Sequence, residues 1–180
     1  WGSEEEAAPR ELRPRALALA EVRGQLGELE AALGLAREAC SAGEPDRLDC
    51  IALRRIAWVA MEGGDLEEAE ERYRDALSRT EALLGPDHPD LAEARGELGA
   101  LLVEQNRWGE AAEELQVALA LAVRLLGERH PLVGVIRSNL AAALEGLEEL
   151  PRARAELVES LSIGEERLPP GHRSLWLRHR

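Results

Sequence analysis

Apolar residues recur every three or four positions along most of the chain, and polar stretches interrupt them at regular intervals. Within residues 90–104, one such set consists of Leu91, Ala94, Leu98, Leu101 and Leu102. This spacing puts the whole set on one face of an α-helix. Beyond the polar stretch EQNRWGE, a second set consists of Ala111, Leu115, Ala118, Leu119 and Ala122. The pattern predicts pairs of amphipathic helices and therefore an all-α fold.

The helix-pair pattern repeats with a period of 42 residues. Residues 84–125 align without a gap over residues 126–167, and the matched positions include Leu84/Leu126, Gly85/Gly127, His88/His130, Pro89/Pro131, Leu98/Leu140, Ala111/Ala153 and Leu115/Leu157. Residues 42–83 continue in the same register, whereas residues 10–41 match less regularly, at an offset of 40. A period of this length is typical of helical solenoids. We expect a single domain over residues 10–168, built from repeats at about 10–41, 42–83, 84–125 and 126–167.

The two ends of the chain fall outside these repeats. Residues 1–9 are rich in glutamate and begin with Trp rather than Met, so we expect a disordered or artificially added start. Residues 169–180 are expected to form a capping segment and a basic tail, because Leu168, His172 and Leu175 continue the register of the repeat. A solenoid must cover its open apolar edge, and Trp176 is the residue that we expect to do so.

The residues between helix pairs have the chemistry of helix ends. Gly85 and Gly127 follow a predicted second helix, where glycine can adopt the left-handed conformation that ends it. Pro89 and Pro131 then fall in the first turn of the next helix, which tolerates proline. A small residue recurs once per repeat early in the second helix, at Ala69, Ala111 and Ala153. We expect the two helices of a pair to approach closely at this small residue.

This arrangement resembles the tetratricopeptide repeat family, in the 42-residue form found in kinesin light chain. The resemblance is carried by the sequence LG-x-x-HP before the first helix and by the small residue after Leu98 and Leu140. It is also carried by the residue after the turn within each repeat, which is Leu66, Trp108 or Leu150. The resemblance implies a right-handed superhelical solenoid of about four antiparallel helix pairs. It also places Trp108 in the core, between the two helices of its repeat.

Composition is consistent with a closely packed helical core and narrows the choice of partners. The chain has no Phe, one Tyr and one Met, so burial depends on Leu, Ala, Val and Ile, of which Ala and Leu favour helices. The net charge of −13 argues against nucleic acid or an anionic membrane as a partner. No apolar run approaches the roughly 18 residues that indicate a membrane span, and we expect a cytoplasmic protein. Cys40 and Cys50 are interpreted as small buried or half-buried thiols, with a local disulfide as the alternative in an oxidising compartment.

His88, His130 and His172 are the sharpest candidates for chemistry, because stacked repeats would set them in a row. Packed helices lie about 8–10 Å apart, whereas a zinc–histidine bond is about 2 Å long, so neighbouring histidines could not share one ion. We interpret them as parts of the joints between repeats and expect no metal site and no cofactor. Catalysis has no support either, because the chain lacks a Gly-x-Ser-x-Gly elbow and a phosphate-binding glycine-rich loop. The pairs Glu67–Glu68 and Glu113–Glu114 are interpreted as solvated faces of second helices.

The inward flank of the first helices is where a partner is expected to bind. The groove candidates on this flank are Arg15, Arg54, Arg55, Trp58, Glu62, Glu97, Glu104, Ser138 and Asn139. Arg54 and Arg55 offer forked donors for carboxylates or phosphates, and Trp58 offers a rigid aromatic anchor. Asn139 matches an Asn that kinesin light chain-like repeats tend to carry, where it can hold a peptide backbone. The alternative is that the charged residues of this flank only pair with one another.

We therefore expect a non-catalytic protein–protein interaction module that binds a peptide segment or a partner helix in its groove. The alternative is a self-association scaffold, in which the apolar C-terminal edge near Leu175 and Trp176 forms a homodimer, or a regulatory domain of a larger signalling protein. A role as an enzyme or as a small-molecule binder is the third possibility, and it has the least support in the sequence.

Overall fold

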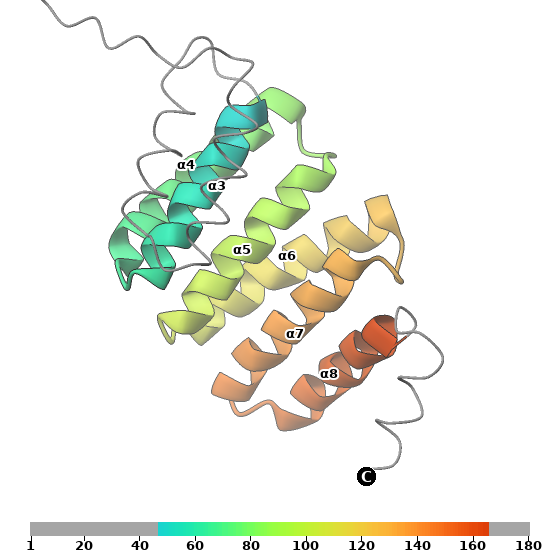
Figure 1. Ribbon diagram of the computed structural model, residues 1–180. Coiled ribbons are helices and arrows are strands. Elements are labelled where there is room, and N and C mark those ends of the chain that lie inside the picture. The colour runs from blue at the N-terminus through green and yellow to red at the C-terminus, as the bar shows by residue number, and fades with distance from the viewer. Residues whose placement is uncertain (1–46, 166–180) are drawn as a thin grey trace, which may run out of the picture. The chain divides into compact units, whose positions relative to one another are not determined.

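The structure, a computed structural model, describes residues 47–165, and this part of the chain consists of helices without a strand (Figure 1). The helices are α3 (Arg47–Glu62), α4 (Leu66–Leu84), α5 (Pro89–Glu104), α6 (Trp108–Leu126), α7 (Pro131–Gly146) and α8 (Leu150–Glu165). Short turns join consecutive helices, so each repeat is a helix pair, as predicted. The expected first repeat at 10–41 and the expected capping segment at 169–180 lie outside the described residues.

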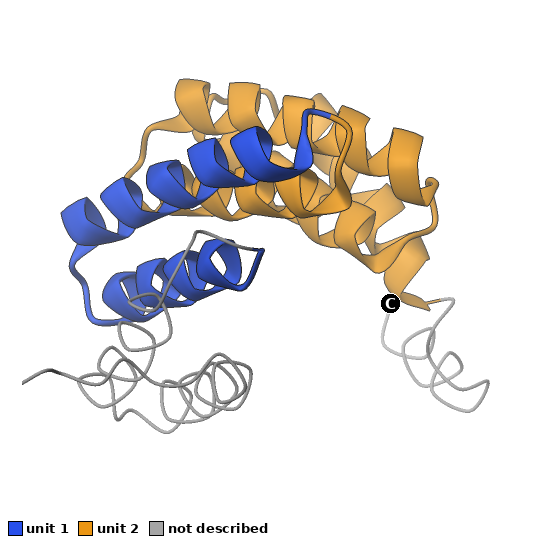
Figure 2. Cartoon of the chain, turned by 90° about the horizontal axis from the view of Figure 1, so that it is seen from above, with its two compact units in different colours: residues 1–86 blue, residues 87–180 orange. Residues whose placement is uncertain are grey.

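The chain divides into two compact units, residues 1–86 and residues 87–180 (Figure 2). In the first unit, α3 packs against α4. In the second unit, α6 packs against both α5 and α7, α5 also contacts α7, and α8 packs against α7. The division lies close to the expected boundary between the second and third repeats, and the expectation of one domain over 10–168 stays a prediction.

The glycine joints have a positive φ, as predicted, but their ψ angles of 173° at Gly85 and 156° at Gly127 are extended and do not belong to the left-handed helical conformation that we expected. Gly85 and Gly127 have φ angles of 81° and 88°, in the region that side chains disfavour. Their backbone N–H groups donate to the carbonyl oxygens of Glu81 and Val123, at 2.9 and 3.0 Å. These hydrogen bonds use carbonyl groups of the last helical turn, which have no partner within a helix. Each glycine thus ends a second helix, and the chain continues from it into the next first helix.

Close approach of α5 and α6 depends on small residues, as expected. Ala111 is completely buried at the start of α6. Gly99 of α5 lies directly against Leu115 of α6, because a Cβ atom added at Gly99 would be 2.5 Å from Leu115 Cγ. A second tight contact joins successive first helices, since a Cβ at Gly96 would be 3.2 Å from Ile136 Cγ1 on α7. These contacts fix which sides of α5 and α7 remain at the surface.

Candidate functional site

Each first helix carries its own stripe of residues that are not fully buried, at equivalent positions of the repeat. On α5 it consists of Glu93, Glu97 and Ala100, and on α7 of the equivalent residues Val135, Asn139 and Ala142. On α3, in the other compact unit, the equivalent residues are Ile51, Arg55 and Trp58. We call these nine residues the first-helix face. Spacings of four and three residues keep each set on one side of its helix.

Ion pairs join the first helix to the second helix within the second compact unit, on the side of the first helix opposite this face, since Arg95 is two residues away from both Glu93 and Glu97. Arg95 Nη1 on α5 lies 2.7 Å from Glu114 Oε2 on α6. The equivalent residues of the next repeat form the same contact, with Arg137 Nη1 on α7 2.5 Å from Glu156 Oε2 on α8. All four side chains are partly buried, and each pair ties a first helix to its second helix. Sequence analysis missed these pairs, although their recurrence at 42 residues was visible.

The arginines and Trp58 of the predicted groove do not all lie on the first-helix face. Arg55 and Trp58 are half-buried on the stripe of α3, and Glu62 is exposed at the end of that helix. Arg54 is only 6% exposed. It occupies the position that Gly96 holds in α5, on the side of the helix next to the stripe, so Arg55 and Trp58 are the accessible candidates. Arg15 lies outside the described residues.

The second compact unit brings predicted and unpredicted residues together. Glu97 lies on the stripe of α5, and Glu104 is exposed at its end. Ser138 and Asn139 line a pocket of about 380 Å³ between α7 and α8. The other lining residues, which sequence analysis missed, are Pro131, Gly134, Val135, Ser160, Ile163 and Gly164. One feature of the sequence could have indicated this pocket: Ser160 and Gly164 stand where the preceding repeat has alanine, at 118 and 122.

The histidines of the joints cap helices. The Nδ1 atom of His88 accepts a hydrogen bond from the backbone N–H of Asp90 at 3.1 Å. His130 Nδ1 accepts from Leu132 N–H in the same way, at 3.2 Å. Each histidine is the N-cap of a helix whose first residue is proline. These contacts give the two histidines a structural role that sequence analysis had not specified, while His172 lies outside the described residues.

Replacing His130 with alanine is expected to destabilise the protein by about 1 kcal/mol, since loss of an N-cap acceptor costs about this much. Replacement with asparagine, a preferred N-cap residue, should restore most of the stability. Urea unfolding followed by far-ultraviolet circular dichroism measures both effects. If the asparagine and alanine variants lost equal stability, the capping role of the imidazole would be refuted.

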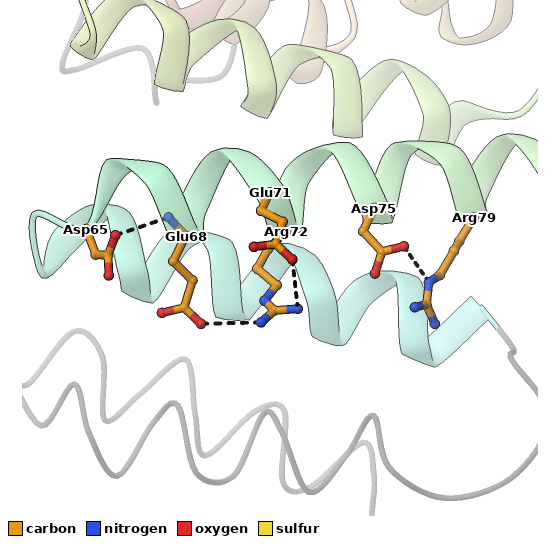
Figure 3. A network of polar contacts seen from close by, with 6 residues as sticks. All are labelled: Asp65, Glu68, Glu71, Arg72, Asp75 and Arg79. Atoms are coloured by element: carbon orange, nitrogen blue, oxygen red, sulfur yellow. Dashed lines mark hydrogen bonds and ion pairs between the residues drawn. The ribbon is translucent and has the colours of Figure 1, made fainter.

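The charges of α4 are mostly paired within the helix. Figure 3 shows six such residues along α4. Asp65 caps the helix by accepting from Glu68 N–H at 3.1 Å, and Arg72 lies 3.6 Å from the Glu68 carboxylate. Arg79 donates to Asp75 at 2.8 Å. Pairs of this kind, four residues apart, support the helix by a few tenths of a kcal/mol each.

Between residues 47 and 165, no group of three or more His, Cys, Asp or Glu side chains is placed to hold a metal ion. None of the helices in this range combines the length and apolar character that crossing a membrane requires. Cys50 is a buried thiol in α3, as expected, and Cys40 lies outside the described residues.

Comparison with known families explains the repeat. Tetratricopeptide repeat models match residues 48–122 and again residues 133–174. Together the two matches cover well over half of the chain. The chain belongs to the tetratricopeptide repeat family.

Solved structures of tetratricopeptide repeats share this fold. BtubC (BKLC) from P. vanneervenii gives a TM-score of 0.78 at 21% identity, over 92% of this chain and 68% of that one. A putative kinesin light chain with nearly identical TPR-like repeats, from Podosopora anserina, gives 0.74 at 20% identity, over 90% of this chain and 79% of that one. A search of curated proteins found no match. The all-α helical-repeat fold is thereby confirmed.

Trp108 has a contact that the tetratricopeptide repeat pattern did not predict. It is the first residue of α6 and is half-buried. A Cβ atom added at Gly146, the last residue of α7, would lie 2.2 Å from Trp108 Cδ2. The indole ring therefore packs on the end of the following first helix. Trp108 thus contributes to the junction between repeats, whereas its expected place in the core between the two helices of its own repeat stays a prediction.

Proposed function

We propose that the protein is a non-catalytic interaction module that binds a peptide segment or partner helix on the first-helix face. The supporting observation is the regular exposure of this face. Equivalent residues of α5 and α7 stay accessible there, while Arg95 and Arg137, on the opposite side of these helices, pair with the second helices. Tetratricopeptide repeat proteins bind protein partners, which is consistent with such a use.

The chemistry of the face in the second compact unit favours a particular kind of segment. Glu93 and Glu97 place two carboxylates on α5, so a basic side chain of the partner would be favoured there. Asn139 on α7 can both donate and accept hydrogen bonds, as an extended peptide backbone requires. Val135 and Ala142 flank it with apolar surface. We therefore expect a segment that carries Arg or Lys beside a small apolar residue.

On α3 the charge of the face has the opposite sign. Arg55 offers a planar guanidinium group that suits a carboxylate or phosphate, and Trp58 lies one turn further along the helix. An aromatic anchor beside an arginine is typical of residues that dominate protein interfaces. This part of the face should therefore prefer an acidic segment. The chain as a whole has a net charge of −13, so a preference for anions would be confined to this part of the face.

Selection from a random peptide display library tests the proposal. Enriched peptides should carry Arg or Lys, and binding of a selected peptide should weaken at least about tenfold in Glu97→Arg, which corresponds to roughly 1.4 kcal/mol. Asn139→Ala should weaken it as well, because the partner backbone would lose its hydrogen bonds. Glu113→Arg is the matched control, since it makes the same charge change at an exposed position of α6. Equal losses in Glu97→Arg and Glu113→Arg, or no enriched peptide, would contradict binding at the first-helix face.

A further inference from the structure

Helix α8, the last described helix of the second compact unit, exposes apolar side chains along one side (Figure 1). Leu150, Leu157 and Leu161 are 59%, 42% and 54% exposed. Spacings of seven and four residues place these leucines on the same side of the helix, and the exposed Val158 lies beside them. We call these four residues the α8 strip. A contiguous apolar surface of this kind is typical of a protein–protein contact.

An arginine lies within the α8 strip where the preceding repeat has a small residue. Arg154 comes four residues after Leu150 and three before Leu157, and it is exposed. Its equivalent on α6 is Ala112, which is buried. A buried alanine leaves room for a neighbouring helix, whereas a guanidinium group that is covered by a partner needs acceptors from that partner. The α8 strip therefore favours an apolar partner that also carries a carboxylate.

The charges of α8 run in the opposite direction to those of the preceding second helix. Helix α6 has Glu110 in its first turn and Arg124 in its last turn, as the helix dipole favours. Helix α8 has no acidic residue in its first turn and no basic residue in its last turn. Instead, Arg152 and Arg154 lie in its first half, and Glu165 is its last residue. This order is unfavourable for a helix alone and becomes favourable beside an antiparallel helix of the same sequence.

One antiparallel register satisfies the apolar and the charged residues together. When Leu157 of one copy faces Leu161 of the other, the two-fold axis passes between them and the reciprocal contact forms as well. Arg154 then faces Gly164 of the other copy, where an added Cβ atom would meet no atom within 4 Å. The guanidinium group can extend over this glycine toward Glu165, the next residue. A two-fold contact contains each of these pairs twice.

We propose that α8 forms a homodimer contact, in which the α8 helices of two copies pack antiparallel with Leu157 against Leu161 and Arg154 beside Glu165. The inference goes beyond the proposed function, because its residues lie on a second helix and the first-helix face takes no part in it. A dimer would carry two such faces and would favour partners that contain the bound segment twice. The C-terminal edge that the sequence suggested for self-association lies outside the described residues, and α8 is a different surface.

Sedimentation equilibrium of the full chain tests the contact. The wild type should show a concentration-dependent equilibrium between monomer and dimer. Leu161→Asp should raise the dissociation constant of the dimer at least about tenfold, because each copy would bring a carboxylate into the apolar contact.

Leu83→Asp is the matched control, since Leu83 is a leucine of α4 with 46% of its surface exposed. Its dissociation constant should stay within about twofold of the wild type, because it lies outside the contact. A wild-type monomer at every concentration would mean that another occupant, such as residues 166–180 of the same chain, covers the α8 strip. That result, or equal effects of Leu161→Asp and Leu83→Asp, would overturn the proposed dimer.

Charge reversal separates a second copy from loss of folding. Arg154→Glu and Glu165→Arg should each weaken the dimer at least about threefold, and the double variant should recover most of this loss because each copy carries both reversed charges. Either single change brings α8 closer to the charge order that the helix dipole favours, so helicity should not fall. A double variant that dimerises more weakly than both single variants would refute the pairing of Arg154 with Glu165.

Disulfide trapping tests the antiparallel register. In a chain with Cys40→Ser and Cys50→Ala, Leu157→Cys and Leu161→Cys are made separately, and one variant carries a tag that changes its size. Oxidation of an equimolar mixture should give mostly mixed dimers, because the two positions face each other. Each variant alone should crosslink less, since its two thiols are offset by four residues, about 6 Å along the helix. Preferential crosslinking of identical variants, or no crosslink in the mixture, would refute the register.

Discussion

Replacing Gly99 with alanine should destabilise the second compact unit by about 1–2 kcal/mol, although alanine is the better helix former. The new methyl group would lie 2.5 Å from Leu115 Cγ, at the closest approach of α5 and α6. Leu115 has no exposed surface, so its side chain cannot move aside into solvent. Overpacking of a core costs about 1–3 kcal/mol, which exceeds the gain of roughly 1 kcal/mol from replacing glycine within a helix.

The sign of the effect should reverse when the leucine is removed. In a Leu115→Ala background, Gly99→Ala should raise stability by up to about 1 kcal/mol, since only the helix preference remains. Gly109→Ala is a control in the wild-type background, because a Cβ at Gly109 meets no atom within 4 Å. Urea unfolding followed by circular dichroism gives the midpoints. A loss of equal size in both backgrounds would show that Leu115 is not the cause.

The same position in the next repeat shows why sequence predicts only part of this contact. The sequence has a small residue at Gly99 and at Ala141, and the equivalent positions Leu115 and Leu157 of the second helices are both leucine. It did not indicate which of the two leucines is held in place. Leu115 is enclosed, whereas Leu157 is 42% exposed. Whether such a leucine is enclosed depends on the helix that follows its repeat, so the sequence of its own repeat does not predict its burial.

Helix boundaries were predictable because they are set locally. The predicted helix over 90–104 is α5, Pro89–Glu104, and the breaks at Gly85 and Gly127 are where the pattern placed them. Glycine, proline and the apolar period act within one or two turns of the chain. The fold class could therefore be derived from the repeat, and the family comparison confirmed it.

The candidate site was less predictable, because it depends on which side of the helix each residue lies. Arg54 and Arg55 are adjacent, so their side chains point about 100° apart. That angle separates a residue that is 6% exposed from one on the first-helix face. The apolar period defines the direction of the core to within a wide stripe. It does not show whether a residue on the neighbouring side of the helix is exposed or is covered by the next first helix, as Gly96 is covered by Ile136.

Gly146→Ala should destabilise the same compact unit by about 2 kcal/mol, through a contact between successive repeats. The added Cβ would lie 2.2 Å from Trp108 Cδ2 and 2.6 Å from Trp108 Cε2. These atoms belong to a rigid ring that must move as a whole. In α5 the equivalent of Gly146 is Glu104, and on α8 the equivalent of Trp108 is Leu150. Both members of this pair therefore differ from their equivalents in the other repeat. Trp108 is larger than Leu150, and Gly146 is smaller than Glu104.

A double-mutant cycle with Trp108→Leu tests this compensation. Leucine is the residue that the chain itself uses at positions 66 and 150. In the Trp108→Leu background, Gly146→Ala should cost at least about 1 kcal/mol less than in the wild type, because a smaller and flexible side chain can make room. Gly164→Ala serves as the control, since a Cβ there meets no atom within 4 Å. Additive effects of the two substitutions would mean that the indole ring and Gly146 do not constrain each other.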